Sequence, residues 1–338
     1  MKYIAAASIS LCLAGCADSG GSGVAGNGAD EVLVIYCPHP LEFINPIVSE
    51  FEARTGIRTY VQTGGTGELL RMVEEQEEPA CDIFWGGSLS TTMPKKDLFE
   101  PYVSRNEDMV RDEFKNEEGN VSRFTDVPSV LMVNTNLIGD IQVKGYADLL
   151  KPELKGRIAM CNPATSSSAY EHLINMLYAM GDGNPEEGWD YVEQFCRNLD
   201  GQLLGGSSEV YQGVAEGRFA VGLTFEEGAA HYVAAGEPVQ IIYMEEGVIS
   251  KADVVCIVKG CGHMAGAKDF VDFVTGKDAQ TVIANKLDRR SVRKDVEEPS
   301  YLPDKDRLNI IYDAPDVVNG NKKGWLERFA GIYREVSG

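Results

Sequence analysis

Residues 157–180, RIAMCNPATSSSAYEHLINMLYAM, contain the signals of a strand, a loop and a helix in succession. Residues 157–161 are apolar enough for a buried strand, and Asn162-Pro163 breaks it. Apolar residues then recur at helical spacing as far as Met180, which predicts a helix. Four consecutive hydroxyl-bearing residues stand between the strand and the helix: Thr165, Ser166, Ser167 and Ser168.

These four hydroxyls stand where the predicted helix begins. The first N–H groups of a helix have no partner inside it, and the helix dipole places partial positive charge there. Added hydroxyl donors make this junction a binding site for an anion. The alternative is ordinary helix capping, which needs a single serine or threonine. The anion site is favoured because similar junctions recur along the chain.

Three earlier strands, predicted at residues 32–36, 58–62 and 82–85, also run into polar or glycine-bearing loops. Glycines in such loops let a ligand approach backbone N–H groups closely. An open α/β sheet with parallel strands has this pattern, and its ligands bind beyond the carboxyl ends of the strands. A later loop, residues 205–208, precedes another short helix. The candidate ligand-binding residues in these loops are His39, Thr63, Gly65, Thr66, Gly67, Gly87, Ser88 and Ser207.

The length and charge of the chain narrow the classes of function. A chain of 338 residues suggests about two domains of ~150 residues each, and two blocks rich in strand–helix units suggest two facing lobes. The formal net charge of −21 comes from 31 basic and 52 acidic residues, which argues against a nucleic-acid or anionic-membrane surface as partner. A small anionic ligand remains compatible, because exposed charges are screened beyond ~8 Å at physiological salt.

The N-terminus reads as an export signal. A short positive start and an apolar run too short to span a membrane end in residues 13–16, LAGC. This tetrapeptide resembles the bacterial lipobox, which predicts cleavage before Cys16 and lipidation of that cysteine; an ordinary secretory signal is the alternative. Residues 17–30 then form a flexible Gly/Ser-rich tether.

Six cysteines remain beyond the predicted anchor. An even number in an exported protein permits disulfides, although several lie in strand-like runs and are typical of small buried apolar residues. The chain has no Cys/His spacing of a metal site, so we expect neither a bound metal nor a cofactor.

Taken together, several segments resemble the extracytoplasmic solute-binding proteins of bacterial ABC importers, in the cluster that includes ferric-iron, hexose-phosphate and phosphonate binders. The resemblance covers most of the mature chain. Besides the lipobox, it rests on these segments: residues 37–57, CPHPLEFINPIVSEFEARTGI; 63–70, TGGTGELL; 81–88, CDIFWGGS; 162–173, NPATSSSAYEHL; 214–236, VAEGRFAVGLTFEEGAAHYVAAG; and 252–284, ADVVCIVKGCGHMAGAKDFVDFVTGKDAQTVIA.

The resemblance implies a type II periplasmic-binding-protein fold, in which two α/β lobes joined by crossover hinge strands enclose a ligand cleft. It places residues 31–129 and 252–309 in the first lobe and residues 130–251 and 310–338 in the second. Hinge strands are expected near residues 130–133 and 252–255. It also implies a monomer that delivers its solute to an ABC permease in the membrane.

The resemblance also bears on the ligand. His39 stands where ferric-binding members have an iron-ligand histidine, although a loop histidine capping the backbone is the alternative. Those members use two adjacent tyrosines where this chain has Glu226-Glu227, and a carboxylate where it has Gly86-Gly87-Ser88. A small organophosphate, a sugar phosphate or phosphonate, is therefore favoured over ferric iron.

Glu226 and Glu227 match polar residues that contact sugar hydroxyls in hexose-phosphate binders. The alternative is a solvated helix start that interacts favourably with the dipole. Two other functions stay open: a ligand-sensing partner of a membrane receptor, and an exported enzyme using His39 with Glu226 or Glu227 as acid and base. The enzyme is disfavoured, because no nucleophile stands beside a base at a known motif spacing.

Overall fold

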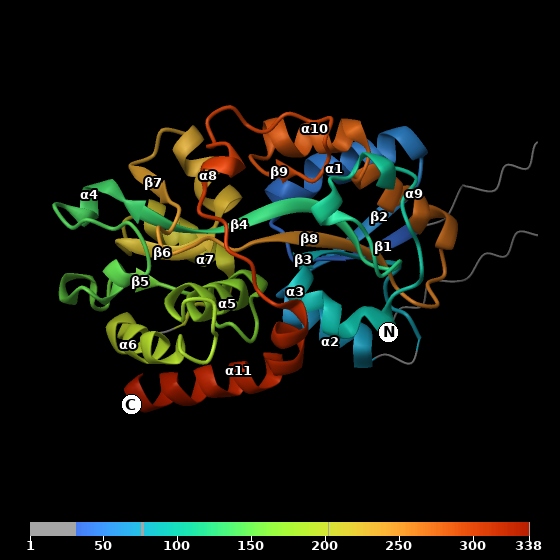
Figure 1. Ribbon diagram of the computed structural model, residues 1–338. Helices are drawn as coiled ribbons and strands as arrows, with labels where there is room; N and C mark the ends of the chain where they lie inside the picture. The colour runs from blue at the N-terminus through green and yellow to red at the C-terminus, as the bar shows by residue number, and fades with distance from the viewer. Residues whose placement is uncertain (1–31, 76–77, 202, 338) are drawn as a thin grey trace, which may run out of the picture.

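The computed structural model of the protein describes residues 32–75, 78–201 and 203–337. The predicted signal, Cys16 and the tether lie outside these residues. Strands and helices alternate along most of the chain (Figure 1). The strands are β1 (Val32–Cys37), β2 (Arg58–Thr63), β3 (Ile83–Ser88), β4 (Ser122–Asn134), β5 (Ile158–Ala159), β6 (Val221–Phe225), β7 (Val239–Ile242), β8 (Ser250–Ile257) and β9 (Arg290–Ser291). The α-helices are α1 (Leu41–Thr55), α2 (Thr66–Glu75), α3 (Leu89–Thr92), α4 (Thr135–Ile138), α5 (Ser167–Met180), α6 (Trp189–Leu199), α7 (Ser207–Ala215), α8 (Glu226–Ala234), α9 (Met264–Val274), α10 (Lys277–Lys286) and α11 (Pro315–Ser337).

The first half of the sheet begins with the parallel strands β2, β1 and β3, as the strand–loop–helix pattern predicts. β8 joins β3 in antiparallel register, and β4 joins β8 in the same sense. Helices α1 and α9 pack through aromatic side chains, with the ring centroids of Phe51 and Phe270 5.1 Å apart. Burying these rings together with the apolar strand residues beneath them stabilises this half.

Strand β4 belongs to both halves of the molecule. Its first residues, from Ser122 to Pro128, pair with β8, whereas Ser129 to Val133 pair with β6. β7 and the parallel pair β5–β6 complete the second half. In Figure 1, β4 and β8 run side by side between two groups of helices.

Each half has its own hydrophobic core. One core gathers β1, β3, α1 and α9 around Trp85. The other gathers β4, β6, α5, α6 and α11 around Leu131 and Trp189. The two-lobed α/β fold expected from the sequence is therefore present. The exact residues at which the lobes divide, and the hinge positions within β4 and β8, stay predictions.

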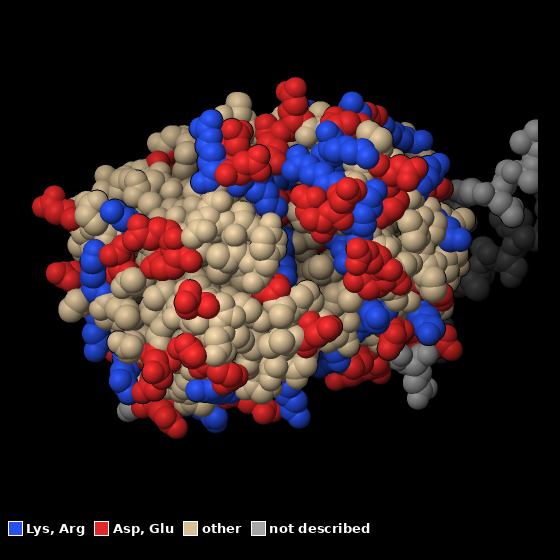
Figure 2. Space-filling view, viewed as in Figure 1, with Lys and Arg blue, Asp and Glu red and all other residues tan. Residues whose placement is uncertain are grey.

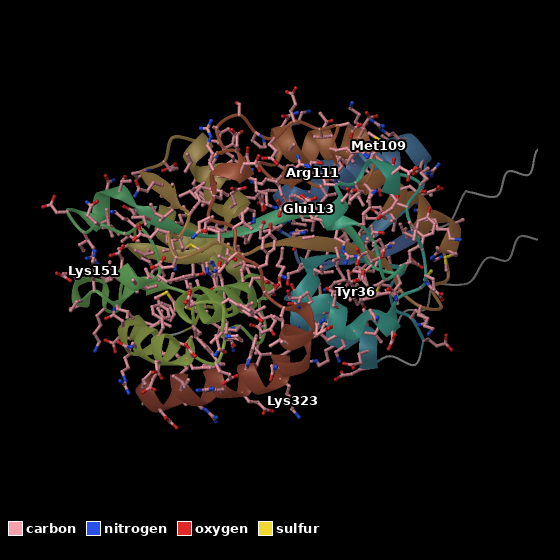
Figure 3. All side chains as sticks on the ribbon, viewed as in Figure 1. Tyr36, Met109, Arg111, Glu113, Lys151 and Lys323 are labelled. Carbon is pink, nitrogen blue, oxygen red and sulfur yellow. The ribbon has the colours of Figure 1, made fainter. Side chains whose placement is uncertain are left out.

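A long irregular segment between α3 and β4 carries Met109, Arg111 and Glu113 and lies near β9 (Figure 3). The Arg111 N–H donates to the Val292 carbonyl at 2.9 Å, and its guanidinium pairs with Glu298 at 3.0 Å. These contacts fix the chain around β9, which supplies residues to the site described below.

The six cysteines within the described residues are all free, and Cys261 is the one of them that is not fully buried. Burial raises the pKa of the Cys81 and Cys161 thiols to about 12, so they are not nucleophiles at neutral pH. In the described part of the chain, no helix is both long and apolar enough to span a membrane.

Candidate functional site

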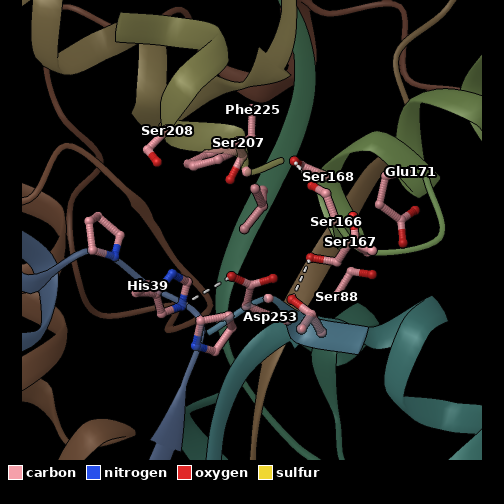
Figure 4. Close-up of a pocket in the computed structure, with 18 of the residues that line it drawn as sticks. His39, Ser88, Ser166, Ser167, Ser168, Glu171, Ser207, Ser208, Phe225 and Asp253 are labelled. Carbon is pink, nitrogen blue, oxygen red and sulfur yellow. Dashed lines mark hydrogen bonds and ion pairs between the residues drawn. The ribbon is translucent and has the colours of Figure 1, made fainter. Parts of the chain in front are cut away.

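A cavity of about 360 Å³ lies between the two lobes, at the carboxyl ends of β1, β2 and β3 (Figure 4). Its wall contains eleven of the fourteen residues that the sequence suggests as ligand contacts: His39, Thr63, Gly65, Thr66, Gly87, Ser88, Thr165, Ser166, Ser167, Ser168 and Ser207. The three others, Gly67, Glu226 and Glu227, do not line it. The first residues of α2, α5 and α7 all line this cavity, and the first N–H groups of a helix have no partner within the helix itself.

In the loop of residues 165–168 at the start of α5, one hydroxyl caps the helix and others face the cavity. Ser166 is the N-cap and accepts from the Ala169 N–H at 3.5 Å, and its Oγ lies 3.0 Å from that of Ser168. Ser167 instead reaches across the cleft, where its Oγ lies 3.3 Å from Thr66 Oγ1 (Figure 4). Ser166 therefore satisfies the helix, while Ser167 and Ser168 keep hydroxyl capacity for a ligand.

The glycines of the second loop serve the contact between lobes as well as the cavity. A Cβ at Gly65 would lie 3.1 Å from the Thr165 carbonyl oxygen, and one at Gly67 would lie 3.0 Å from that of Ala164. Gly67 borders an adjoining groove rather than the cavity. The sequence pattern predicts that these glycines permit ligand approach, and the structure shows that they also let the two loops touch.

The third loop packs against the first two. Gly87 has a φ of +76°, which side chains rarely adopt, and a Cβ there would lie 2.5 Å from Thr66 Cγ2. A Cβ at Gly86, whose φ is +117°, would meet the His39 ring at 2.8 Å. Both glycines therefore allow the three loops to converge, and Ser88 follows them as the cap of α3.

His39 is a buried neutral base at one end of the cavity. Burial, helped by the positive Arg289, holds its pKa well below the usual range. Its Nε2 lies 3.4 Å from Asp253 Oδ2 and makes no hydrogen bond (Figure 4). A neutral imidazole beside a carboxylate can take part in a hydrogen bond to a ligand hydroxyl.

Glu226 and Glu227 are used within the protein, which corrects their placement in the cleft. Glu226 is 1% exposed and holds Arg290 through two hydrogen bonds, at 2.7 and 2.9 Å. Glu227 pairs with Arg289 at 2.5 Å. Burial raises the pKa of Glu226, against the opposing effect of Arg290. The pair is therefore neither a solvated helix start nor a free acceptor for ligand hydroxyls.

Arg289 is a cavity residue that the sequence argument missed. Its buried guanidinium pairs with Asp253 at 2.7 Å as well as with Glu227, and it lies over the rings of Phe43 and Phe225 at 4.7 and 5.4 Å. Its Nε makes no hydrogen bond. Nothing in the local sequence marks it, because its partners come from β8 and α8, 36 and 62 positions earlier in the chain.

Two further missed residues, Glu171 and Lys251, lie in the same wall. Glu171 stands one helical turn after Ser167, so the i, i+4 spacing along α5 was a usable signal for it. Lys251 forms an ion pair with Asp313. Burial raises the pKa of Glu171 to about 7, opposed mainly by Lys251.

A family model described as bacterial extracellular solute-binding protein matches residues 32–286, most of the chain. The chain belongs to this family. Members capture solutes outside the cytoplasm and are not enzymes, so the predicted extracytoplasmic solute-binding role is confirmed, and the alternative of an exported enzyme is set aside.

Individual proteins are similar to this solute-binding protein in sequence or in fold. A probable ABC transporter periplasmic-binding protein of Sinorhizobium fredii is 24% identical over 310 residues, which cover 88% of this chain and 85% of the relative. The periplasmic binding protein AfuA of Actinobacillus pleuropneumoniae, solved with fructose-6-phosphate, has a TM-score of 0.83 at 23% identity, covering 90% of this chain and 99% of AfuA.

A solved protein described as a two-component system protein that mediates signal transduction is 30% identical to this solute-binding protein, with a TM-score of 0.77. The match covers 88% of this chain and 100% of that one. Ferric-ion-binding proteins share the fold as well.

The site of this solute-binding protein has no cluster suited to a metal. Within the residues that the structure describes, no group of three or more His, Cys, Asp or Glu side chains is placed to hold an ion. His39 faces Asp253, while Glu226 and Glu227 do not line the cavity and are paired with Arg290 and Arg289. The residues that the iron hypothesis would combine are therefore not available together in this arrangement.

Proposed function

We propose that this protein captures a small organophosphate, a sugar phosphate or a phosphonate, and delivers it to the permease of an ABC importer. The observation that carries the proposal is the convergence of three helix starts and their hydroxyls on one cavity between the lobes. Helix N-termini and neutral hydroxyls are a chemistry that proteins use for phosphate.

The charges around the cavity support an anion held by neutral donors. The two cationic residues of the wall, Arg289 and Lys251, already have carboxylate partners in Asp253, Glu227 and Asp313. The surface around the molecule carries acidic and basic side chains intermixed, as Figure 2 shows for one face, rather than a single positive field. Recognition would then rest on directed hydrogen bonds more than on net charge.

Hydrogen bonds from the cavity hydroxyls are strong enough to account for micromolar binding of a phosphate group. A hydrogen bond to a charged group contributes roughly 1.5–3 kcal/mol, so four such bonds approach the ~8 kcal/mol of a micromolar affinity. Thr66, Ser167, Ser168 and Ser207 are the hydroxyls we assign to the phosphate. Binding entropy and desolvation oppose the sum.

The other end of the ligand needs new partners, because Glu226 and Glu227 are taken by arginines. We assign this role to Asp253 and His39. In Figure 4, His39 lies across the cavity from Ser88 and Ser167, and Asp253 lies between them. A carboxylate accepts hydrogen bonds from sugar hydroxyls or from an ammonium group.

Titration calorimetry tests the proposal directly. We expect fructose 6-phosphate or 2-aminoethylphosphonate to bind with micromolar affinity, and free fructose and ferric citrate not to bind. Binding of ferric citrate alone would overturn the organophosphate assignment and favour the iron alternative.

A sensing role is the second candidate, because the relative at 30% identity is described as a signal-transduction protein. Deleting the gene separates the two roles. Loss of growth on the phosphorylated ligand as sole carbon or phosphorus source, with the permease still expressed, supports import. Loss of a transcriptional response to that ligand, with uptake intact, supports sensing.

The anchor at Cys16 and the monomeric state are part of the same proposal. The LAGC junction and the tether behind it would hold the protein at the outer face of a membrane. Cys16→Ser should release the protein into the soluble fraction; an intact protein that stays membrane-bound would contradict the anchor. Light scattering of the soluble variant should give the mass of one chain.

A further inference from the structure

Glu171 is a buried carboxyl in the cavity wall that has no hydrogen-bond partner in the protein. Its side chain is 5% exposed, and both carboxyl oxygens lack a hydrogen bond. An unsatisfied buried polar group costs stability and so calls for an explanation. A partner supplied by the ligand is one, because Glu171 lines the cavity itself.

The side of the cavity where Glu171 lies is the side of the anion donors. It follows Ser167 by one turn on α5, and Figure 4 shows its carboxyl beside Ser88 and Ser167, away from His39. Ser88 gives its own proton to Thr91 Oγ1 at 3.1 Å. The end of a ligand that reaches this place is therefore the oxyanion held by the helix starts.

The two lysines nearest Glu171 make their direct contacts with other groups. Lys251, on β8, pairs with Asp313 of the segment before α11. Lys322, on α11, donates to the Thr91 carbonyl at 3.1 Å and lies 4.9 Å from the Tyr170 ring. The hydroxyls of Ser88 and Ser90 lie near enough to lower the pKa of Glu171 against burial. Neither makes a hydrogen bond of normal length to it, and Ser88 donates to Thr91 instead. Neither lysine forms an ion pair with Glu171. The positive charge of Lys251 opposes the effect of burial on the pKa of Glu171 without cancelling it.

We propose that Glu171 binds the ligand as a neutral acid and donates its proton in a hydrogen bond to the oxyanion. The inference rests on the proposed organophosphate function and deepens it, since it makes capture proton-linked. An ionised Glu171 would repel the phosphate in a site of low dielectric, whereas the acid form adds one more donor. Burial already raises the pKa of this carboxyl to about 7, so the acid form is available near neutral pH.

The alternative ligand for an ionised Glu171 is an ammonium group, and the two chemistries give opposite pH dependence. If the acid form binds, affinity falls as the pH rises through about 7. If the carboxylate binds an ammonium group, affinity rises over the same range. Titration of the phosphate itself, near pH 6, is removed by comparison with a variant that cannot titrate at position 171.

The test is calorimetry with fructose 6-phosphate between pH 6 and pH 8 on the wild type, Glu171→Gln and Glu209→Gln. The wild-type dissociation constant should rise about tenfold more than that of Glu171→Gln, because the fraction of a group titrating near 7 that is protonated falls about tenfold over this range. Glu209 stands exposed in the first turn of α7 outside the cavity wall, so Glu209→Gln removes a charge near a helix start and should keep the wild-type profile.

The possible results separate the two proposals. Parallel pH profiles for the wild type and Glu171→Gln, with binding present, overturn the role of Glu171 and leave the organophosphate function standing. A wild-type affinity that rises with pH, relative to Glu171→Gln, also overturns it and assigns Glu171 to an ammonium group. Absence of binding of every phosphorylated or phosphonated probe to the wild type overturns the proposed function, and this inference falls with it.

Discussion

The helix starts of α5 and α8 look alike in the sequence and do different work in the structure. Each follows a strand, and each begins with adjacent polar residues, Ser167-Ser168 in α5 and Glu226-Glu227 in α8. The serines line the cavity, whereas the glutamates are held by Arg289 and Arg290. A carboxylate that is buried needs a countercharge, so Glu226 and Glu227 form ion pairs with arginines of the same chain. A neutral hydroxyl needs no countercharge, so it can stay available to bind a ligand.

The largest effect should come from breaking the pair at α8. In Glu226→Gln, Arg290 keeps its charge at 0% exposure and loses its two-bond partner, retaining Glu298. Removing one member of a buried ion pair costs about 3–5 kcal/mol. We expect the free energy of unfolding, measured in urea, to fall by about 3 kcal/mol, the lower end of this range, because Arg290 still pairs with Glu298.

The matched control is Glu227→Gln. Its partner Arg289 keeps Asp253 at 2.7 Å, so the loss of stability should be smaller. A double variant, Glu226→Leu with Arg290→Met, should recover much of the loss, since apolar residues of similar volume replace buried ion pairs well. Equal midpoints for Glu226→Gln and the wild type would show that the pair does not stabilise the fold.

The hydroxyl-bearing loops could be predicted from the sequence, whereas the buried ion pairs could not. The loops around Thr66, Ser88 and Ser167 were predictable, because local spacing places them at the ends of strands and the starts of helices. The ion pair of Glu226 could not be predicted, because its partner Arg290 lies 64 positions away in the chain. Arg289 was missed for the same reason. Glu171 lies between these cases: its helical spacing from Ser167 could be read, but its lack of a partner could not.

Removing the charge of Glu171 should have the opposite sign to the change at Glu226. The pKa of Glu171 is raised by burial from 4.5 in the unfolded chain to about 7 in the folded one. Its contribution to stability is therefore fully present below about pH 4.5 and is lost as the pH rises through 7. At pH 8, Glu171→Gln should stabilise the ligand-free protein by up to about 3 kcal/mol, the equivalent of this shift at ~1.36 kcal/mol per unit.

The measurement is urea unfolding of ligand-free wild type and Glu171→Gln at pH 5 and pH 8. The gain in the free energy of unfolding at pH 5 should be about a quarter of the gain at pH 8. A difference of the same size at both pH values would indicate a packing effect of the amide and would refute the titration of Glu171. A destabilised variant at pH 8 would mean that the carboxylate has an internal partner after all.

The smallest predicted effect tests the serines themselves. Ser167→Ala removes one hydroxyl that faces the cavity and whose other contact is Thr66 Oγ1 at 3.3 Å. Binding of fructose 6-phosphate should weaken about tenfold, which corresponds to ~1.4 kcal/mol. The unfolding midpoint should barely move, because Ser167 does not cap α5.

Ser166→Ala is the counterpart in the same loop: it removes the cap and should cost about 1 kcal/mol of stability. Calorimetry and unfolding on the two variants measure both quantities. If Ser167→Ala lost stability and kept full affinity, α5 would begin with two structural serines, and the contrast with α8 would lose its functional meaning.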